Sequence, residues 1–199
     1  MHHNIIPIYN KMLTRNDKEK LLNQKSICIW FTGLSGSGKT TLGLLLEDFL
    51  YKNNFKTALL DGDNIRHGIN SDLGFSDEDR IENIRRIAEI NKLFLQNGII
   101  TINTFVSPTN AIRNMAKRII GEKDFFLIYT NSSIETCEKR DVKGLYKKAR
   151  KGEIKYFTGI TSLFEEPDNA DLILNTETNT AETCLNIIVE NILPKIKYG

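Results

Sequence analysis

The stretch Gly33-Leu34-Ser35-Gly36-Ser37-Gly38-Lys39-Thr40 decides the fold of this chain. It matches the pattern of a glycine, any four residues and then Gly-Lys-Thr, and it follows a short apolar run at residues 27–31. Apolar residues at helical spacing continue from Lys39 to Leu50. A glycine-rich loop between a strand and a helix is typical of a phosphate-binding loop (P-loop), because its N–H groups can turn inward and the helix dipole adds positive charge.

We expect all eight residues of the P-loop to bind the phosphates of a nucleoside triphosphate. In that interpretation Lys39 reaches the β and γ phosphates, and the Thr40 hydroxyl coordinates Mg²⁺. A merely flexible Gly-Ser turn is the alternative, but the pattern matches throughout and both flanks are correct. The sequence has no Asn-Lys-x-Asp segment of the kind that reads guanine, which favours ATP over GTP.

Outward from the P-loop, strand and helix patterns alternate with short links. Further buried strands are predicted at residues 57–60, 99–106, 124–129 and 172–174, and helices at about residues 76–97, 111–120 and 181–192. This order predicts an α/β fold, a P-loop NTPase-type three-layer sandwich with a mainly parallel central sheet. We expect an N-terminal arm at residues 1–25 and one P-loop domain at residues 26–199. Residues 142–161, rich in Lys, Arg and Gly, have the composition of a mobile lid.

Composition and charge give no support for a nucleic-acid partner or for a place in the membrane. A net charge of +2 from 27 basic and 25 acidic residues gives no field that would favour nucleic acid. Neither a signal peptide nor a membrane anchor is expected, because the N-terminus lacks an apolar core segment. Cys28, Cys137 and Cys184 have no metal-ligand spacing and are odd in number, which argues against a disulfide framework and structural zinc and favours a reducing cytoplasm.

Two carboxylates follow the second predicted strand, in Asp61-Gly62-Asp63-Asn64-Ile65-Arg66. Open α/β sheets bind ligands at this end of their strands. Phosphoryl transfer to an alcohol needs a group that accepts or orients the hydroxyl proton, and Asp63 is the candidate. Asp61 is closer to the strand and is expected beside the magnesium ion or holding Lys39. The alternative is an ordinary solvated Asp-Gly turn.

Downstream, Phe75, Arg80 and Asn83 combine an aromatic surface with donors suited to an anion. The alternative for the arginine is an ordinary ion pair along a helix. A basic run from Lys143 to Lys151 could neutralise charge as a lid closes over two anionic substrates, but a solvated helix explains it equally well.

Taken in order, these segments resemble the adenylyl-sulfate kinase family from about residue 14 to the C-terminus. The P-loop is generic, but the Asp-Gly-Asp-Asn-Ile-Arg segment and Lys143-Gly144-Leu145-Tyr146-Lys147-Lys148 are specific. Further matches are Asp72-Leu73-Gly74-Phe75-Ser76, Glu82-Asn83-Ile84-Arg85-Arg86, Phe105-Val106-Ser107-Pro108 and Phe157-Thr158-Gly159-Ile160. Departures are concentrated near the acceptor side, at Thr109 and at Thr161-Ser162-Leu163-Phe164.

The resemblance implies transfer of the ATP γ-phosphoryl group to the 3′-hydroxyl of adenosine 5′-phosphosulfate, with Mg²⁺ as cofactor, in a cytoplasmic homodimer that acts in sulfate assimilation. It implies that Asp63 orients the hydroxyl and that Phe75 and Phe157 sandwich the acceptor adenine. It also implies a phosphoserine intermediate at Ser107, although in-line transfer between two bound substrates needs none. Acceptor-binding residues by resemblance are Asp63, Asn64, Ile65, Arg66, Phe75, Arg80, Asn83, Val106, Lys143 and Phe157. Two alternatives stay open at this point, a P-loop kinase for another small acceptor and a non-catalytic nucleotide-binding module.

Overall fold

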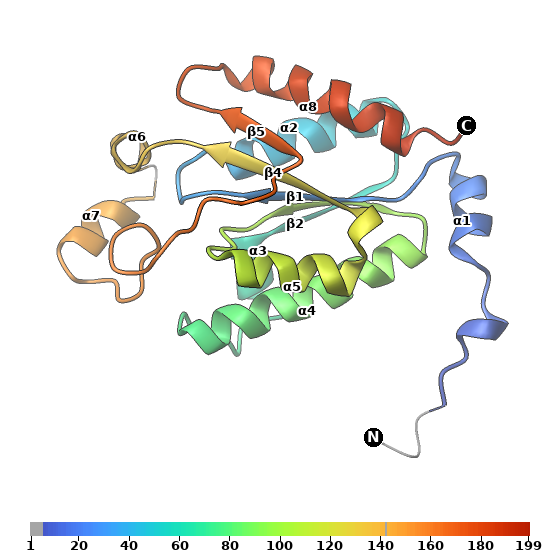
Figure 1. Ribbon diagram of the computed structural model, residues 1–199, viewed down its shortest axis with the longest axis horizontal. Coiled ribbons are helices and arrows are strands. Elements are labelled where there is room, and N and C mark those ends of the chain that lie inside the picture. Colours follow the sequence, from blue (N-terminus) through green and yellow to red (C-terminus); the bar gives the residue numbers. More distant parts are fainter. Residues whose placement is uncertain (1–5, 142) are drawn as a thin grey trace.

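The computed structural model describes residues 6–141 and 143–199, in which a parallel sheet lies between two layers of helices (Figure 1). Its five strands have the order β2-β3-β1-β4-β5 among the described residues. Their bounds are β1 Cys28–Thr32, β2 Thr57–Asp61, β3 Ile100–Thr104, β4 Phe125–Asn131 and β5 Leu172–Asn175. All the pairings are parallel, and the predicted α/β class is confirmed.

Strand β1 is the centre of the sheet, and all of its residues are buried. Ile29 is aligned with Ile102 of β3 on one side and with Phe126 of β4 on the other. Because successive side chains of a strand point to opposite faces, Ile29 belongs to one core cluster and Trp30 to the other. A run that is apolar on both faces marks a strand covered on both sides, as the sequence indicated.

Two helical layers provide that cover, as Figure 1 shows. One layer contains α2 (Lys39–Lys52) and α8 (Ala181–Ile196), and the other contains α4 (Asp77–Gln96) and α5 (Asn110–Ile120). Helix α4 begins where the sequence predicted, because the Ser76 side chain accepts a hydrogen bond from the Asp79 amide at 3.2 Å. Within the described residues, no helix combines the length and the apolar character needed to cross a bilayer.

Three helices were not predicted: α1 (Arg15–Leu22), α3 (Gly62–His67) and α6 (Ile134–Arg140). Two 3₁₀ turns, Tyr9–Lys11 and Glu122–Asp124, complete the elements before α6. The alternative of a solvated turn at Asp61-Gly62 is contradicted, because Asp61 ends β2 and caps α3 with a hydrogen bond from the Asp63 amide at 3.0 Å. The chain therefore passes directly from a strand into a helix at this point.

The last helix is longer than expected. The prediction ended it near Ile192, yet α8 continues through Pro194 to Ile196. A proline inside a helix removes one hydrogen bond. Ile196 is fully buried in the core cluster that covers β1, and its burial accounts for the extra turn.

The predicted lid contains a short helix, α7 (Leu145–Arg150), which lies beyond the strand ends next to α6 (Figure 1). Tyr146 and Ala149 of α7 are buried, so this segment has a small core of its own. That core is Leu34, Cys137 and Tyr146, with Phe157 and Ile160 packed against it. Residue 142 of the predicted lid and residues 1–5 of the predicted arm lie outside the described residues.

Candidate active site

The P-loop turns tightly between β1 and α2, and its three glycines all have positive φ angles that other residues rarely adopt. At Gly33 the backbone φ is 147°, and a Cβ atom there would lie 2.4 Å from the Thr130 hydroxyl. Gly38, the N-cap of α2, has φ of 96° and open space where a Cβ would lie. The N-cap and the first residues of this 14-residue helix line a cavity, and a helix N-terminus at a cavity suits an anion.

Lys39 is buried and is bound by the loop itself. Its Nζ donates to the backbone carbonyls of Gly33 at 2.9 Å and Leu34 at 2.7 Å. Burial lowers the pKa of Lys39 to about 8, and the nearby Asp61 carboxylate opposes this only partly. Carbonyl oxygens are weaker partners for an ammonium group than phosphate oxygens are, so an incoming phosphate can replace them.

Asp61 joins the P-loop to the sheet. Its Oδ2 accepts from the Thr40 hydroxyl at 2.9 Å and from the Thr104 hydroxyl at 2.7 Å. Partial burial would raise the pKa of Asp61, but the hydrogen bonds from Thr104, Thr40 and the Asp63 amide outweigh it, and the pKa lies below its usual value. Asp61 is therefore a carboxylate beside Thr40, and the hydrogen bonds of Lys39 go to the loop carbonyls instead.

Asp63 lies two residues after Asp61, in the first turn of α3. It forms an ion pair with Lys143 of the lid segment, although the two residues are 80 positions apart in the sequence. The side chains are 71% and 61% exposed, so the pair is largely in water. The hydrogen bond to Asp63 raises the pKa of Lys143. Exposed pairs of this kind contribute little free energy, and a substrate can exchange for either partner.

The arginines predicted for the acceptor side lie around Phe75. Arg66 donates to the Gly74 carbonyl at 2.6 Å, and its guanidinium carbon lies 4.4 Å from the centre of the Phe75 ring. Arg80 donates to the Phe75 carbonyl at 3.1 Å and to the Thr158 hydroxyl at 2.5 Å, and also to the Tyr156 carbonyl. Arg80 thereby connects α4 to the far end of the lid segment.

One cavity of about 990 Å³ brings most of the predicted residues together. Its walls come from the P-loop, β2, α3, α4, the loop after β3 and the lid segment. Among the predicted residues it contains Ser35, Gly36, Gly38, Lys39, Thr40, Asp61, Asp63, Arg66, Phe75, Arg80, Asn83, Val106, Ser107, Lys143 and Phe157.

Five predicted residues do not line this cavity: Gly33, Leu34, Ser37, Asn64 and Ile65. Gly33 and Ser37 pack against Thr130, where the Ser37 and Thr130 hydroxyls are 2.7 Å apart. Ile65 packs against the core cluster around Trp30. A side-chain contact from Asn64 or Ile65 to a ligand in the cavity is therefore not supported by their positions.

Ser107 lines the cavity, but only 3% of its surface is exposed. Its backbone φ is 37°, in the left-handed region that a serine rarely adopts. Its hydroxyl accepts from the Trp30 indole at 3.1 Å and donates to Thr32 at 3.1 Å. These partners are not bases, so none of the described residues that bond to the Ser107 hydroxyl would activate it as a nucleophile.

The cavity residues that the sequence reasoning missed include Arg140, Thr176 and Asn179. Arg140, the last residue of α6, donates to the Thr176 carbonyl at 2.5 Å, and the Thr176 hydroxyl donates to the Ser37 carbonyl at 2.9 Å. They form the wall on the side of the P-loop away from Phe75. No local pattern marks them, because Arg140 belongs to a short helix and Thr176 to a turn.

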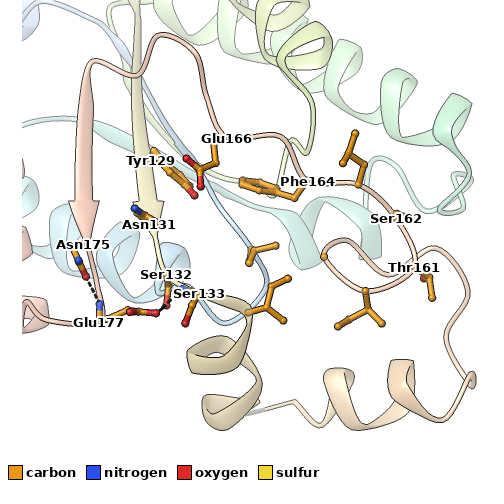
Figure 2. Close-up of a pocket in the computed structure, with 15 residues that line it drawn as sticks. Tyr129, Asn131, Ser132, Ser133, Thr161, Ser162, Phe164, Glu166, Asn175 and Glu177 are labelled. Carbon is orange, nitrogen blue, oxygen red and sulfur yellow. Dashed lines mark hydrogen bonds between the residues drawn. The ribbon is translucent and has the colours of Figure 1, made fainter.

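A second hollow, of about 810 Å³, lies at the carboxyl ends of β4 and β5 (Figure 2). Tyr129, Phe164 and Glu166 lie at one end and Glu177 at the other, where the Ser133 amide donates to the Glu177 carboxylate at 2.5 Å. The described residues that line it include two glutamates and neither lysine nor arginine. Its charge disfavours phosphate, so the cavity at Lys39 is the candidate site.

Comparison with known proteins agrees with this geometry. The model of the family described as adenylylsulphate kinase matches residues 25–175. An adenylyl-sulfate kinase of Bacteroides thetaiotaomicron is 57% identical over 193 residues, which is 97% of this chain and 96% of that protein. One of Clostridium kluyveri is 51% identical over 189 residues, with 95% and 94% of the two chains covered.

A solved structure is also similar, the Mycobacterium tuberculosis APS kinase CysC in complex with AMPPNP and APS. It is 38% identical, covers 85% of this chain and 98% of its own, and has a TM-score of 0.82. These matches agree with the site, which contains a P-loop, an aspartate at the adjacent strand end and arginines around an aromatic ring. The chain belongs to the adenylyl-sulfate kinase family, and its activity is that of an ATP-dependent adenylyl-sulfate kinase.

Proposed function

We propose that the cavity binds ATP and adenosine 5′-phosphosulfate together, and that the γ-phosphoryl group passes directly to the 3′-hydroxyl of the acceptor, giving 3′-phosphoadenosine 5′-phosphosulfate and ADP. The observation that carries the proposal is the convergence of the phosphate-binding loop, Asp63 and the Phe75 arginines on one space. Positioning and charge stabilisation supply most of the rate in phosphoryl transfer, so both substrates must be held in line.

The two ends of the cavity take different substrates in this proposal. ATP lies over the P-loop, with its base toward Arg140, Thr176 and Asn179. The acceptor lies toward α3 and α4, with its adenine between Phe75 and Phe157 and its anionic group near Arg66 and Arg80. Phe157 is held edge-on to Tyr146, with ring centres 4.9 Å apart, so its ring is already oriented.

Asp63 is proposed to accept or orient the proton of the acceptor hydroxyl. Its carboxylate is exposed within the cavity. Its partner is Lys143 of the lid segment, and a lysine side chain has a flexible stem that can turn to another partner. When Lys143 turns to the phosphates, the carboxylate becomes free for the hydroxyl. The free hydroxyl then attacks in line, without a covalent stage at Ser107.

Mg²⁺ is the proposed cofactor, and the residues present fit it. The Thr40 hydroxyl and the Asp61 carboxylate lie 2.9 Å apart at the P-loop. Among the described residues, no group of three or more His, Cys, Asp or Glu residues could hold a metal unaided. A P-loop magnesium ion needs few protein ligands, because phosphates and water supply most of its coordination, and it neutralises charge on the transferred group.

We further propose a homodimer in a reducing cytoplasm. The three cysteines are unpaired and buried, as expected where thiols stay reduced. Dimerisation rests on the family resemblance alone. Light scattering of the purified protein tests it, since a monomeric mass at micromolar concentration would contradict the proposal.

The test of function is ADP release by the purified protein with ATP, Mg²⁺ and micromolar adenosine 5′-phosphosulfate, with adenosine monophosphate as the control acceptor. Turnover with the phosphosulfate and none with the monophosphate is the expected result. Equal turnover with both acceptors would show that the sulfate group is not recognised and would contradict the assignment of Arg66 and Arg80.

A further inference from the structure

Asn70 is a buried residue with no assigned role, in the loop between α3 and α4. Its side chain is fully enclosed, and it does not line the cavity. Its backbone amide donates to the Ile65 carbonyl at 3.0 Å, and its carbonyl accepts from the Leu73 amide at 3.1 Å. These bonds hold the residue in place, with its carboxamide directed at Asn83 of α4.

The contact between the two amides has a defined direction. The Asn70 Nδ2 donates to the Asn83 side-chain Oδ1 at 3.0 Å and also approaches the Asn83 backbone carbonyl at 3.4 Å. If the Asn70 amide were reversed, its oxygen would face that backbone carbonyl, and two acceptors cannot share a hydrogen bond. The backbone oxygen therefore requires Asn70 to be the donor, which makes the Asn83 oxygen the acceptor.

This arrangement leaves the other end of the Asn83 amide free. Asn83 is 4% exposed and lines the cavity beside Arg80 and Phe75. Among the described residues no hydrogen bond is made by its Nδ2 group. With the oxygen held by Asn70, the two N–H donors of Asn83 point away from Asn70. An amide that could rotate freely would also present its oxygen, which would repel an anion.

The arrangement has a cost in stability. The Oδ1 atom of Asn70 is buried and has no hydrogen-bond partner among the described residues. Such an atom lowers the stability of the folded state, because it has given up its hydrogen bonds to water without replacing them. A second pair of asparagines, Asn91 of α4 and Asn103 of β3, shows the satisfied alternative. Asn91 and Asn103 exchange reciprocal hydrogen bonds of 2.8 Å, and Asn91 also donates to the Ile87 carbonyl.

We infer that Asn70 is a positioning residue, which fixes the Asn83 amide so that its N–H donors face the anionic group of the acceptor. The inference rests on the proposed function and on the contact between Asn83 and the acceptor that the family resemblance implies. Asn70 touches no substrate in this interpretation and acts only through Asn83. It would help to select a phosphosulfate over a neutral group at that point in the cavity.

The experiment is a double-mutant cycle with Asn70→Ala, Asn83→Ala and the double variant, and with Asn91→Ala as the matched control. We expect Asn70→Ala to raise the KM for adenosine 5′-phosphosulfate roughly 3- to 10-fold, the equivalent of one net hydrogen bond, with the KM for ATP within about twofold of the parent. In the Asn83→Ala background, Asn70→Ala should have no further effect on the acceptor KM. Asn70→Ser is made in parallel because its smaller void favours folding.

Stability provides the second readout. Asn70→Ala also removes an unpartnered oxygen, so it should lower the melting temperature less than Asn91→Ala does. Asn91→Ala should leave both KM values unchanged. An acceptor KM that does not move in the Asn70 variants, or effects that add in the double variant, would overturn the inference. If Asn83→Ala itself leaves the acceptor KM unchanged, the proposed Asn83 contact fails first, and the role of Asn70 falls with it.

Discussion

The two edges of the central sheet hold their charged side chains by different kinds of contact. At the amino-terminal edge, Arg15 of α1 donates to both oxygens of Asp124, at 2.6 and 2.9 Å, and to the Ser26 carbonyl at 2.5 Å. Glu19 accepts from the Ser26 amide at 2.8 Å. Gln24 is fully buried and bonds to Lys56 and Gly98 at 2.7–3.0 Å.

At the carboxyl-terminal edge the cations have partners that a substrate can replace. Lys39, Arg66 and Arg80 donate to neutral oxygens, mostly backbone carbonyls, and Lys143 pairs with an exposed carboxylate. Bidentate bonds between ions are strong and hold a fixed geometry, whereas carbonyl bonds give way to phosphate. The amino-terminal edge therefore stabilises the fold, and the carboxyl-terminal edge keeps its charges available for binding.

Of the variants that test this difference between the two edges, Lys39→Ala should have the largest effect on activity. The rate of phosphoryl transfer should fall roughly 10³-fold or more, because the variant lacks the buried ammonium group that would stabilise charge on the transferred phosphoryl group. Stability at pH 7 should rise, since the folded state lowers the pKa of Lys39 to about 8 and so opposes its protonation. ADP release and thermal unfolding measure the two effects.

The sign of the pH dependence checks the same residue. Between pH 8 and 10.5 the unfolded state binds more protons at Lys39 than the folded state does. This group should therefore make the parent protein more stable as the pH rises through that range. The Lys39→Ala variant lacks this contribution. A variant that is less stable than the parent at pH 7 would contradict the assignment of a desolvated ammonium group.

Asp63→Ala should lower kcat by roughly 10²- to 10⁴-fold and leave ATP affinity nearly unchanged, because the carboxylate acts on the acceptor hydroxyl. Single-turnover rates and an ATP titration measure both. The matched control is Asp48→Ala, which also breaks an exposed ion pair, with Lys52 at 2.7 Å, but far from the cavity. Full activity in the Asp63 variant would remove the proposed role.

Arg80→Ala should weaken acceptor binding by about 1.5–3 kcal/mol, or roughly 10- to 100-fold in KM, if the guanidinium donates to an anion. The same side chain holds the lid segment through Thr158, so kcat should fall as well. Arg85, on the same helix and paired with Glu82 at 2.6 Å, is the control position. An effect seen only in ATP affinity would rule out the acceptor assignment.

The smallest expected effect on catalysis is that of Arg15→Ala at the opposite edge. The free energy of unfolding should fall by about 2–3 kcal/mol, because the Asp124 carboxylate loses both bonds, while kcat/KM stays unchanged below the melting temperature. Denaturant unfolding and steady-state rates measure this. Lys18→Ala, which removes only a bond to the exposed Asn97 side chain, is the control. A loss of activity in folded Arg15→Ala protein would show that the edges are coupled.

The strands were easier to predict than the short helices. Each predicted strand lies within a few residues of an observed one, because buried parallel strands are short apolar runs between turns. Helix α1 was missed although Thr14 and Asp17 form a capping box at its start. Its Leu21 is 84% exposed, so the helix has no apolar stripe for periodicity to detect. Helix α6 is only seven residues long, too short for a clear period.

The residues of the candidate site also differ in how far the sequence predicts them. The P-loop, Asp63 and Arg80 were found because each lies in a segment with a local pattern or a family resemblance. Arg140, Thr176 and Asn70 were not found, since each acquires its position from a contact with a distant part of the chain. The amide of Asn83 was identified, but its direction depends on Asn70, which no sequence pattern shows.

The sequence by itself determined the parallel α/β class, the phosphate-binding loop and the kinase family, because these depend on glycines, apolar spacing and charges among near neighbours in the chain. Only the tertiary structure decided which charges meet across the cavity, how deeply Lys39 and Ser107 are buried, and which way the Asn83 amide faces. Burial and hydrogen-bond direction depend on atoms supplied by several elements at once, and these come together only when the chain has folded.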